Sequence, residues 1–168
     1  MASSREQQLV YMLEHGHTRD AIVLLNWLDD FRFTALFRFD GDWLRYVEMY
    51  DREDPQGARG DDLPVVASYC QLVRESGAAV EIRDSLRDAR VDGHPKRDVV
   101  RSYCSAPLFD DAGRLCGTVC HFDADVRPIT PRTADGLAMF ARLLREHPGA
   151  MAGVLGAPAD RPGLQPTH

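Results

Sequence analysis

Apolar and polar positions alternate most clearly in the last third of the chain. The alternation predicts a strand over Ser102–Phe109 and a second strand over Leu115–Phe122. Between them, Asp111-Ala112-Gly113 has the residue types of a tight turn. The two strands are therefore expected to form an antiparallel hairpin.

A second hairpin is predicted nearer the N-terminus. Aromatic residues recur in Phe33–Phe39, the dipeptide Asp40-Gly41 is a strong hairpin turn signal, and Trp43–Met49 fits the returning strand. A short strand is also expected over Ala79–Ile82. Five strands that are mostly joined as hairpins favour one antiparallel sheet.

Helical spacing of apolar residues predicts four helices. The first is preceded by Ser4-Arg5-Glu6-Gln7, which fits a capping box, and the last by Thr130-Pro131, a cap followed by proline. The helices are expected at Arg5–His15, Arg19–Asp29, Val65–Glu75 and from Pro131 to about Glu146. Together with the strands they give a mixed α+β module. Helices cover mainly one face of its sheet, and long loops cover the other.

Composition divides the chain into three parts. Residues 1–17 are expected to form an N-terminal helix and residues 18–147 a single domain. Residues 148–168, rich in Gly, Pro and Ala, are expected to be either a disordered tail or a docking tail. Within the domain, the charged segment Arg83–Arg97 lacks periodicity and is interpreted as a long, partly structured loop near any pocket.

Charge and composition narrow the function classes. The 168 residues, 44% of them hydrophobic, suit one domain with a buried core, and the net charge of −6 argues against an electrostatic nucleic-acid binder. No apolar run is long enough to span a membrane, and the N-terminus lacks the pattern of a signal peptide. We therefore expect a cytoplasmic protein whose four cysteines are thiols.

The closing hairpin also carries a family resemblance. The run SAPLFDDAGRLCGTVCHFD resembles the last hairpin of GAF domains, which are sensory modules related to PAS domains. RFTALFRFDGDWLRYV is similar to the family's first hairpin, and SYCQLVRESGAAVEIRD to its central helix and the short strand after it. DARVDGHPKRDVVRSYCSAPL resembles its long loop, and DADVRPITPRTADGLAMFARLL its connector and closing helix. The resemblance covers roughly residues 18–145.

The resemblance implies an architecture and a role. GAF domains have an antiparallel sheet of about six strands, with helices from both termini on one face and a ligand pocket on the other. The terminal helices often form a dimer interface. The resemblance therefore implies a sensory domain rather than an enzyme. It would bind a small molecule of unknown identity, form a homodimer through its terminal helices, and act in signal transduction through a separate signalling protein.

Analogy with the family places the pocket residues. Tyr69 and Tyr103 could stack on a flat ligand, Asp84 could accept hydrogen bonds, and His94 could close the loop over the ligand. The complete candidate set is Phe37, Tyr69, Asp84, His94, Tyr103, Ser105 and His121. Each also has a structural explanation: a tyrosine in an apolar stripe is usually core, His-Pro is common in turns, and an aspartate can cap nearby backbone donors.

The cysteines are the candidate redox groups. In a regular strand Cys116 and Cys120 share one face, about 13 Å apart, and cannot bond to each other. Cys104 lies on the neighbouring strand and could approach either of them. Burial of all four cysteines as small apolar side chains is the favoured interpretation. The alternative is a redox pair, or the catalytic thiols of a free methionine-sulfoxide reductase, an enzyme built on the GAF fold.

Other ligand classes find little support. The six histidines are scattered, so no metal site is expected. Cys120 and His121 are consecutive in a strand and point to opposite faces, unlike the pair that holds a bilin pigment. The Asn-Lys-Phe-Asp-Glu signature of cyclic-nucleotide binders is absent, so the cofactor is unknown.

A third interpretation of the protein's function is an interaction module whose pocket is filled by side chains such as Phe37 and Tyr103.

Overall fold

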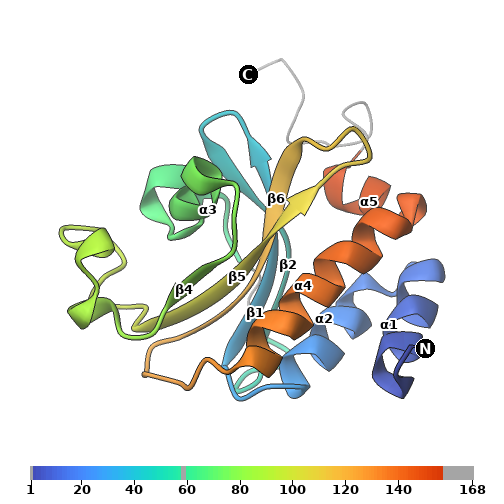
Figure 1. Ribbon diagram of the computed structural model, residues 1–168, viewed down its shortest axis with the longest axis horizontal. Coiled ribbons are helices and arrows are strands. Elements are labelled where there is room, and N and C mark those ends of the chain that lie inside the picture. Colours follow the sequence, from blue (N-terminus) through green and yellow to red (C-terminus); the bar gives the residue numbers. More distant parts are fainter. Residues whose placement is uncertain (1, 58–59, 157–168) are drawn as a thin grey trace.

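A six-stranded antiparallel sheet forms the centre of the molecule (Figure 1). The computed structural model describes residues 2–57 and 60–156. Along the sheet the strand order is β3-β2-β1-β6-β5-β4. The strands are β1 (Phe33–Asp40), β2 (Trp43–Asp51), β3 (Leu63–Pro64), β4 (Val80–Ile82), β5 (Ser102–Phe109) and β6 (Leu115–Asp123). Both predicted hairpins and the α+β class are confirmed.

Helices divide between the two faces of this sheet (Figure 1). The helix face is covered by α1 (Ser4–Glu14), α2 (Thr18–Trp27), α4 (Pro131–Glu146) and α5 (Pro148–Leu155). The loop face is covered by α3 (Cys70–Ser76) and the short 3-10 turns η1 (Val65–Ala67), η2 (Ser85–Arg87) and η3 (Ala89–Val91). None of the helices in the described part of the chain is long and apolar enough to cross a bilayer.

The alternation along β1 separates two hydrophobic cores. Leu36 packs with Leu137 and Phe140 in the core under the helix face. Its neighbours Ala35 and Phe37 belong to the second core, under α3 and the loops. Successive side chains of a strand point to opposite faces, so one strand contributes to both cores.

A bulge interrupts this alternation at Cys116. Leu108 of β5 pairs with Gly117, but Phe109 pairs with Leu115, which leaves Cys116 as the extra residue. As a result Cys116 joins the core under the helix face, whereas Cys120 belongs to the core under the loop face. The prediction that these two cysteines share a face is therefore wrong.

Helix boundaries depart from the predictions in two places. Ser3, not Ser4, caps α1, and its hydroxyl accepts a hydrogen bond from the Glu6 amide. The helix expected over Val65–Glu75 is broken at Ser68, whose backbone is extended. The Ser68 hydroxyl instead accepts the Cys70 amide at 3.0 Å, so α3 begins only there.

The C-terminal segment is partly ordered. Of the two alternatives predicted for the tail, disorder is wrong for Pro148–Leu155, which form α5 and pack on the core. Ala150, Met151 and Val154 recur at helical spacing on this helix and are buried in the core under the helix face. The last part of the predicted tail, residues 157–168, lies outside the described residues.

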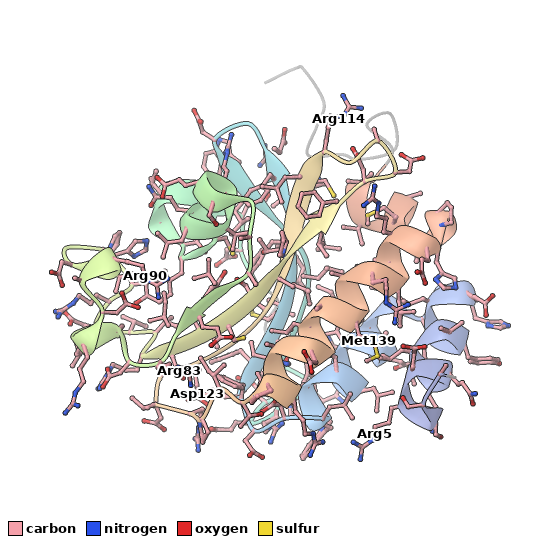
Figure 2. All side chains as sticks on the ribbon, in the orientation of Figure 1. Arg5, Arg83, Arg90, Arg114, Asp123 and Met139 are labelled. Carbon is pink, nitrogen blue, oxygen red and sulfur yellow. The ribbon has the colours of Figure 1, made fainter. Side chains whose placement is uncertain are left out.

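Asp123 ties the end of β6 to the start of β1 (Figure 2). Its carboxylate accepts hydrogen bonds from the Arg32 amide at 3.0 Å and from Nε of Arg127 at 2.9 Å. It also accepts the Asp125 amide at 2.9 Å. The side chain is only 2% exposed, and these charge-assisted contacts offset the cost of burying it.

His121 lies under the helix face. Its Nδ1 is 2.7 Å from Oγ1 of Thr34, which accepts a hydrogen bond from Nδ2 of Asn26 at 2.8 Å. The His121 ring stacks on Phe31, with centroids 5.4 Å apart. This placement corrects the prediction that His121 lines the pocket.

Replacing Gly117 with alanine should destabilise the protein strongly. An ideal Cβ at Gly117 would lie 2.1 Å from the Phe37 carbonyl oxygen, and this backbone atom is held by the central strand pairing. We expect Gly117→Ala to lower the free energy of unfolding by about 2 kcal/mol or more in urea denaturation. Gly136→Ala in α4 is the matched control, because its Cβ meets nothing within 4 Å and should stabilise the helix by about 1 kcal/mol or less. Equal stabilities would contradict the close approach.

His121 should make stability fall in mildly acidic solution. Burial, followed by the charge of Arg52, lowers the pKa of His121 to about 3, so the native protein keeps the ring neutral while the unfolded chain binds a proton. The contribution of His121 to the free energy of unfolding should therefore be fully present above about pH 6.5. Below that pH the free energy of unfolding should decrease by about 1.4 kcal/mol per pH unit as the pH falls toward 5.

Denaturant titrations between pH 7 and pH 5 measure this slope. His121→Gln should reduce it, while the exposed His17→Gln serves as the control and should leave it unchanged. A residual slope is expected from His94, because burial lowers the pKa of that residue too. A His121→Gln variant with the wild-type slope would contradict the assignment.

Candidate functional site

A cavity of about 360 Å³ lies on the loop face of the sheet. Strands β1, β2, β5 and β6 form its floor, while the start of α3, the segment before α3 and the loop before β5 form its wall. It is lined by Phe37, Met49, Asp61, Leu63, Ser68, Tyr69, Cys70, Lys96, Val100, Tyr103, Cys120 and Phe122. Its volume lies at the lower end of the range for small-molecule sites, and its lining is mostly apolar and aromatic, as in such sites.

Three of the predicted pocket residues line this cavity. Phe37, Tyr69 and Tyr103 come from β1, the residue before α3, and β5. The Tyr69 hydroxyl donates a hydrogen bond to the Val100 carbonyl at 2.8 Å. Its ring meets that of Tyr103 edge to face, with centroids 5.5 Å apart. Both tyrosine rings are therefore held in place at the cavity wall.

His94 supports the wall from behind rather than lining it. Nδ1 of His94 accepts the Lys96 amide at 3.0 Å, which leaves the proton on Nε2, 3.2 Å from the Ser68 carbonyl. The ring also packs against Tyr69, with centroids 4.8 Å apart. His94 thus joins the loop that carries Lys96 to the segment before α3.

Asp84 and Ser105 also lie outside the lining. The Asp84 carboxylate binds Nη2 of Arg101 at 2.9 Å and accepts the Leu86 amide at 3.1 Å, so it caps η2. The hydrogen bond from Arg101 is the main reason that the pKa of Asp84 is lowered. Ser105 is buried on β5 between Val80 and Cys120 in the paired strands. Neither side chain contacts the cavity.

Two thiols meet at the cavity wall, one from α3 and one from β6. Sγ of Cys70 lies 3.3 Å from the Tyr103 hydroxyl and 3.2 Å from the Thr118 hydroxyl. The thiol of Cys120 also hydrogen-bonds to that of Cys70. Both cysteines line the cavity, although they are buried from bulk solvent.

The surroundings of the two thiols shift their pKa values in opposite directions. Burial opposes ionisation of Cys70, but hydrogen bonds from Cys120, Ser68, Thr118 and Tyr103 outweigh it and lower the pKa of this thiol. The pKa of Cys120 is raised by its hydrogen bond to Cys70 and by burial. A thiolate in this site would therefore be carried by Cys70.

The other two cysteines lie under the helix face. Cys104 and Cys116 both belong to the core below α4. Burial raises the pKa of Cys104 to about 12 and that of Cys116 to about 11. Of the two approaches that the sequence left open for Cys104, the one to Cys120 is ruled out, because these two side chains leave their strands on opposite faces of the sheet.

Charged groups at the cavity are few. Lys96 is half-buried, and within the described ranges no carboxylate lies close enough to form an ion pair with its ammonium group. Asp61 lines the cavity too but is exposed to solvent. Among the described residues, no three His, Cys, Asp or Glu side chains gather in a way that could hold a metal ion.

Sequence reasoning missed several cavity residues, of which Cys70 and Lys96 are the most reactive chemically. Cys70 falls within the predicted helix Val65–Glu75, and the extended backbone of Ser68 that breaks this helix has no clear pattern in the sequence. Lys96 follows His94-Pro95, so its place in the predicted loop was the available signal.

Three solved structures are similar to this chain in fold. A protein described as a GAF sensor from Burkholderia vietnamiensis superimposes with a TM-score of 0.71 at 16% identity, over 91% of this chain and 95% of that one. The phycoerythrobilin-bound GAF domain of a cyanobacterial phytochrome has a TM-score of 0.69 at 12% identity, over 90% and 94%. Free methionine-R-sulfoxide reductase from Neisseria meningitidis, in complex with its substrate, superimposes with a TM-score of 0.65 at 16% identity, over 89% of this chain and 93% of that one.

The sequence comparison adds the family. No curated protein matches the chain at a significant level. The family model for the GAF domain matches residues 10–146, which span α1 to α4 and therefore all six strands and the whole cavity. The chain belongs to the GAF domain family.

Proposed function

We propose that this protein is a sensory GAF domain that binds a small molecule in the cavity on the loop face. The observation that carries the proposal is the cavity itself, with about 360 Å³ of space between aromatic walls. A bilin occupies one structural neighbour and a substrate another, which supports the use of this fold for small ligands. The predicted interaction module with a filled pocket fits less well, because Phe37 and Tyr103 form walls around the space.

The lining suggests the chemistry of the ligand. Tyr69, Tyr103 and Phe122 offer faces and edges for a flat apolar body. The half-buried Lys96 offers a positive charge to an anionic group. We therefore propose a small aromatic or otherwise planar molecule that carries a carboxylate or similar anion.

The output of such a sensor would pass through the elements around the cavity. A ligand that favours one arrangement of α3 and the Lys96 loop shifts the population of that arrangement, and a partner protein can respond to it. A separate signalling partner and a cytoplasmic location stay predictions. A homodimer through the terminal helices is also a proposal, supported by the exposed Tyr11 on α1.

The reductase alternative is supported by two neighbours. Besides the Neisseria enzyme, the free methionine sulfoxide reductase of Staphylococcus aureus superimposes with a TM-score of 0.67 at 14% identity. Cys104, the residue expected to carry this chemistry, lies on the face away from the cavity, which argues against it.

Turnover of free methionine sulfoxide distinguishes the two functions. We expect no methionine to form above background when the protein is incubated with free methionine-R-sulfoxide and dithiothreitol. The reason is that Cys104, the thiol predicted to carry this chemistry, does not reach the cavity. Amino-acid analysis measures the product. Turnover that is lost on replacing Cys70 or Cys120 with serine would establish the enzyme instead.

Filling the cavity should abolish ligand binding. The probe is 8-anilino-1-naphthalenesulfonate, a flat aromatic anion, with affinity and stoichiometry measured by isothermal titration calorimetry. Leu63→Trp adds an indole at the cavity and should weaken binding at least about tenfold, because the ring occupies ligand space. Leu86→Trp is the matched control at an exposed site away from the cavity. Equal affinity of both variants, with unchanged melting temperatures, would place the probe elsewhere and contradict the proposal.

A further inference from the structure

Two thiols, those of Cys70 and Cys120, line this cavity. The two thiols come from different elements, α3 and β6, and hydrogen-bond to each other. We propose that Cys70 and Cys120 form a peroxide-reactive dithiol, which a small peroxide oxidises to a disulfide inside the cavity. The proposal goes beyond ligand binding, since it needs only that the cavity admit a molecule of the size of hydrogen peroxide.

Cys70 has the surroundings of a reactive thiol. The hydroxyl groups of Tyr103 and Thr118, 3.3 Å and 3.2 Å from its sulfur, can both donate to a thiolate. Cys120 supplies a further donor, and the pKa of Cys70 is lowered accordingly. Since the thiolate is the nucleophile of cysteine chemistry, Cys70 is the sulfur that attacks.

Burial makes the site selective for small oxidants. Cys70 is 0% and Cys120 1% exposed to bulk solvent, yet both form part of the cavity wall. A large disulfide reagent would not reach them, whereas a small peroxide could enter through the cavity. Cys104 and Cys116 are buried too, but they lie in the core under the helix face, and burial raises the pKa of each.

The reaction has two steps that balance. The Cys70 thiolate attacks one oxygen of the peroxide, so an S–O bond forms and the O–O bond breaks, and the other oxygen takes up the proton that Cys70 released on ionising and leaves as water or an alcohol. Sulfur of Cys120 then attacks the sulfenic acid at Cys70, so the S–S bond forms and the S–O bond breaks. The departing hydroxide takes the Cys120 proton and leaves as water. Two thiols lose two electrons in total, and the peroxide gains them.

The product would add a covalent bond between two elements that are otherwise joined at this point by packing and by the hydrogen bond between Cys70 and Thr118. A Cys70–Cys120 disulfide joins the first residue of α3 to the centre of β6. It also leaves the sulfur of Cys70 without a thiol hydrogen or a thiolate charge, so its hydrogen bonds with the hydroxyl groups of Tyr103 and Thr118 weaken. Oxidation would therefore change both the wall and the polarity of the cavity. A cellular dithiol would reverse it by thiol–disulfide exchange.

The experiment treats the folded, reduced full chain with a slight excess of hydrogen peroxide. Intact-mass spectrometry should show a loss of about 2 Da, as expected for one disulfide, and dithiothreitol should restore the mass. Peptide mapping without reduction should recover the Cys70 and Cys120 peptides joined. The double variant Cys104→Ser/Cys116→Ser is the matched control and should form the same disulfide at the same rate.

Two further measurements keep the result unambiguous. Cys120→Ser should stop at the sulfenic acid of Cys70, which dimedone traps as a covalent adduct. Circular dichroism confirms that each variant is folded. The proposal is overturned if the native wild-type chain keeps all four thiols, if peroxide joins a different pair of cysteines, or if the disulfide forms only in urea.

Binding of the anilinonaphthalene probe is measured separately on the reduced protein. Failure of disulfide formation and failure of ligand binding can therefore be told apart.

Discussion

β1 and β6 pair from Phe33–Phe122 to Arg38–Gly117 at the centre of the sheet and join the first hairpin to the last. This contact brings together segments that are far apart in the sequence, and both cores are built on its two faces. Gly117 permits the close approach, because a side chain there would meet the Phe37 carbonyl. Asp123 then holds the end of β6 to the start of β1 through the Arg32 amide. The cavity floor depends on this pairing, since Phe37 and Cys120 come from these two strands.

Neighbouring residues of one strand acquire different chemistry on the two faces. Cys120 and His121 are consecutive, yet one lines a cavity and the other stacks on Phe31 beneath α2. On the helix face His121 satisfies a buried polar network and is held neutral by burial. On the loop face Cys120 meets another thiol. The helix face therefore provides the stable support, while the less regular loop face provides the site, as is common for binding residues on loops.

Much of the fold could be predicted from the sequence, because the hairpins rest on period-two alternation and turn residues that act locally. The same alternation failed at Cys116, since a bulge depends on pairing between strands and has no signature in one strand alone. In the candidate site, Phe37, Tyr69 and Tyr103 were placed by family analogy and line the cavity. Cys70 was not, because its exposure to the cavity depends on how α3 sits on the sheet. Helix α5 was missed because its Gly and Pro content masked three buried apolar residues.

The wall where Cys70 meets the sheet is built from groups that have no fixed direction of hydrogen bonding. The hydroxyl group of Tyr103 and the thiols of Cys70 and Cys120 can each turn from donor to acceptor by rotating one hydrogen. Such a wall can satisfy a carbonyl oxygen in one ligand and an amine in another without moving a heavy atom. Discrimination between ligands must then come from the fixed parts of the cavity, which are its aromatic outline and the charge of Lys96.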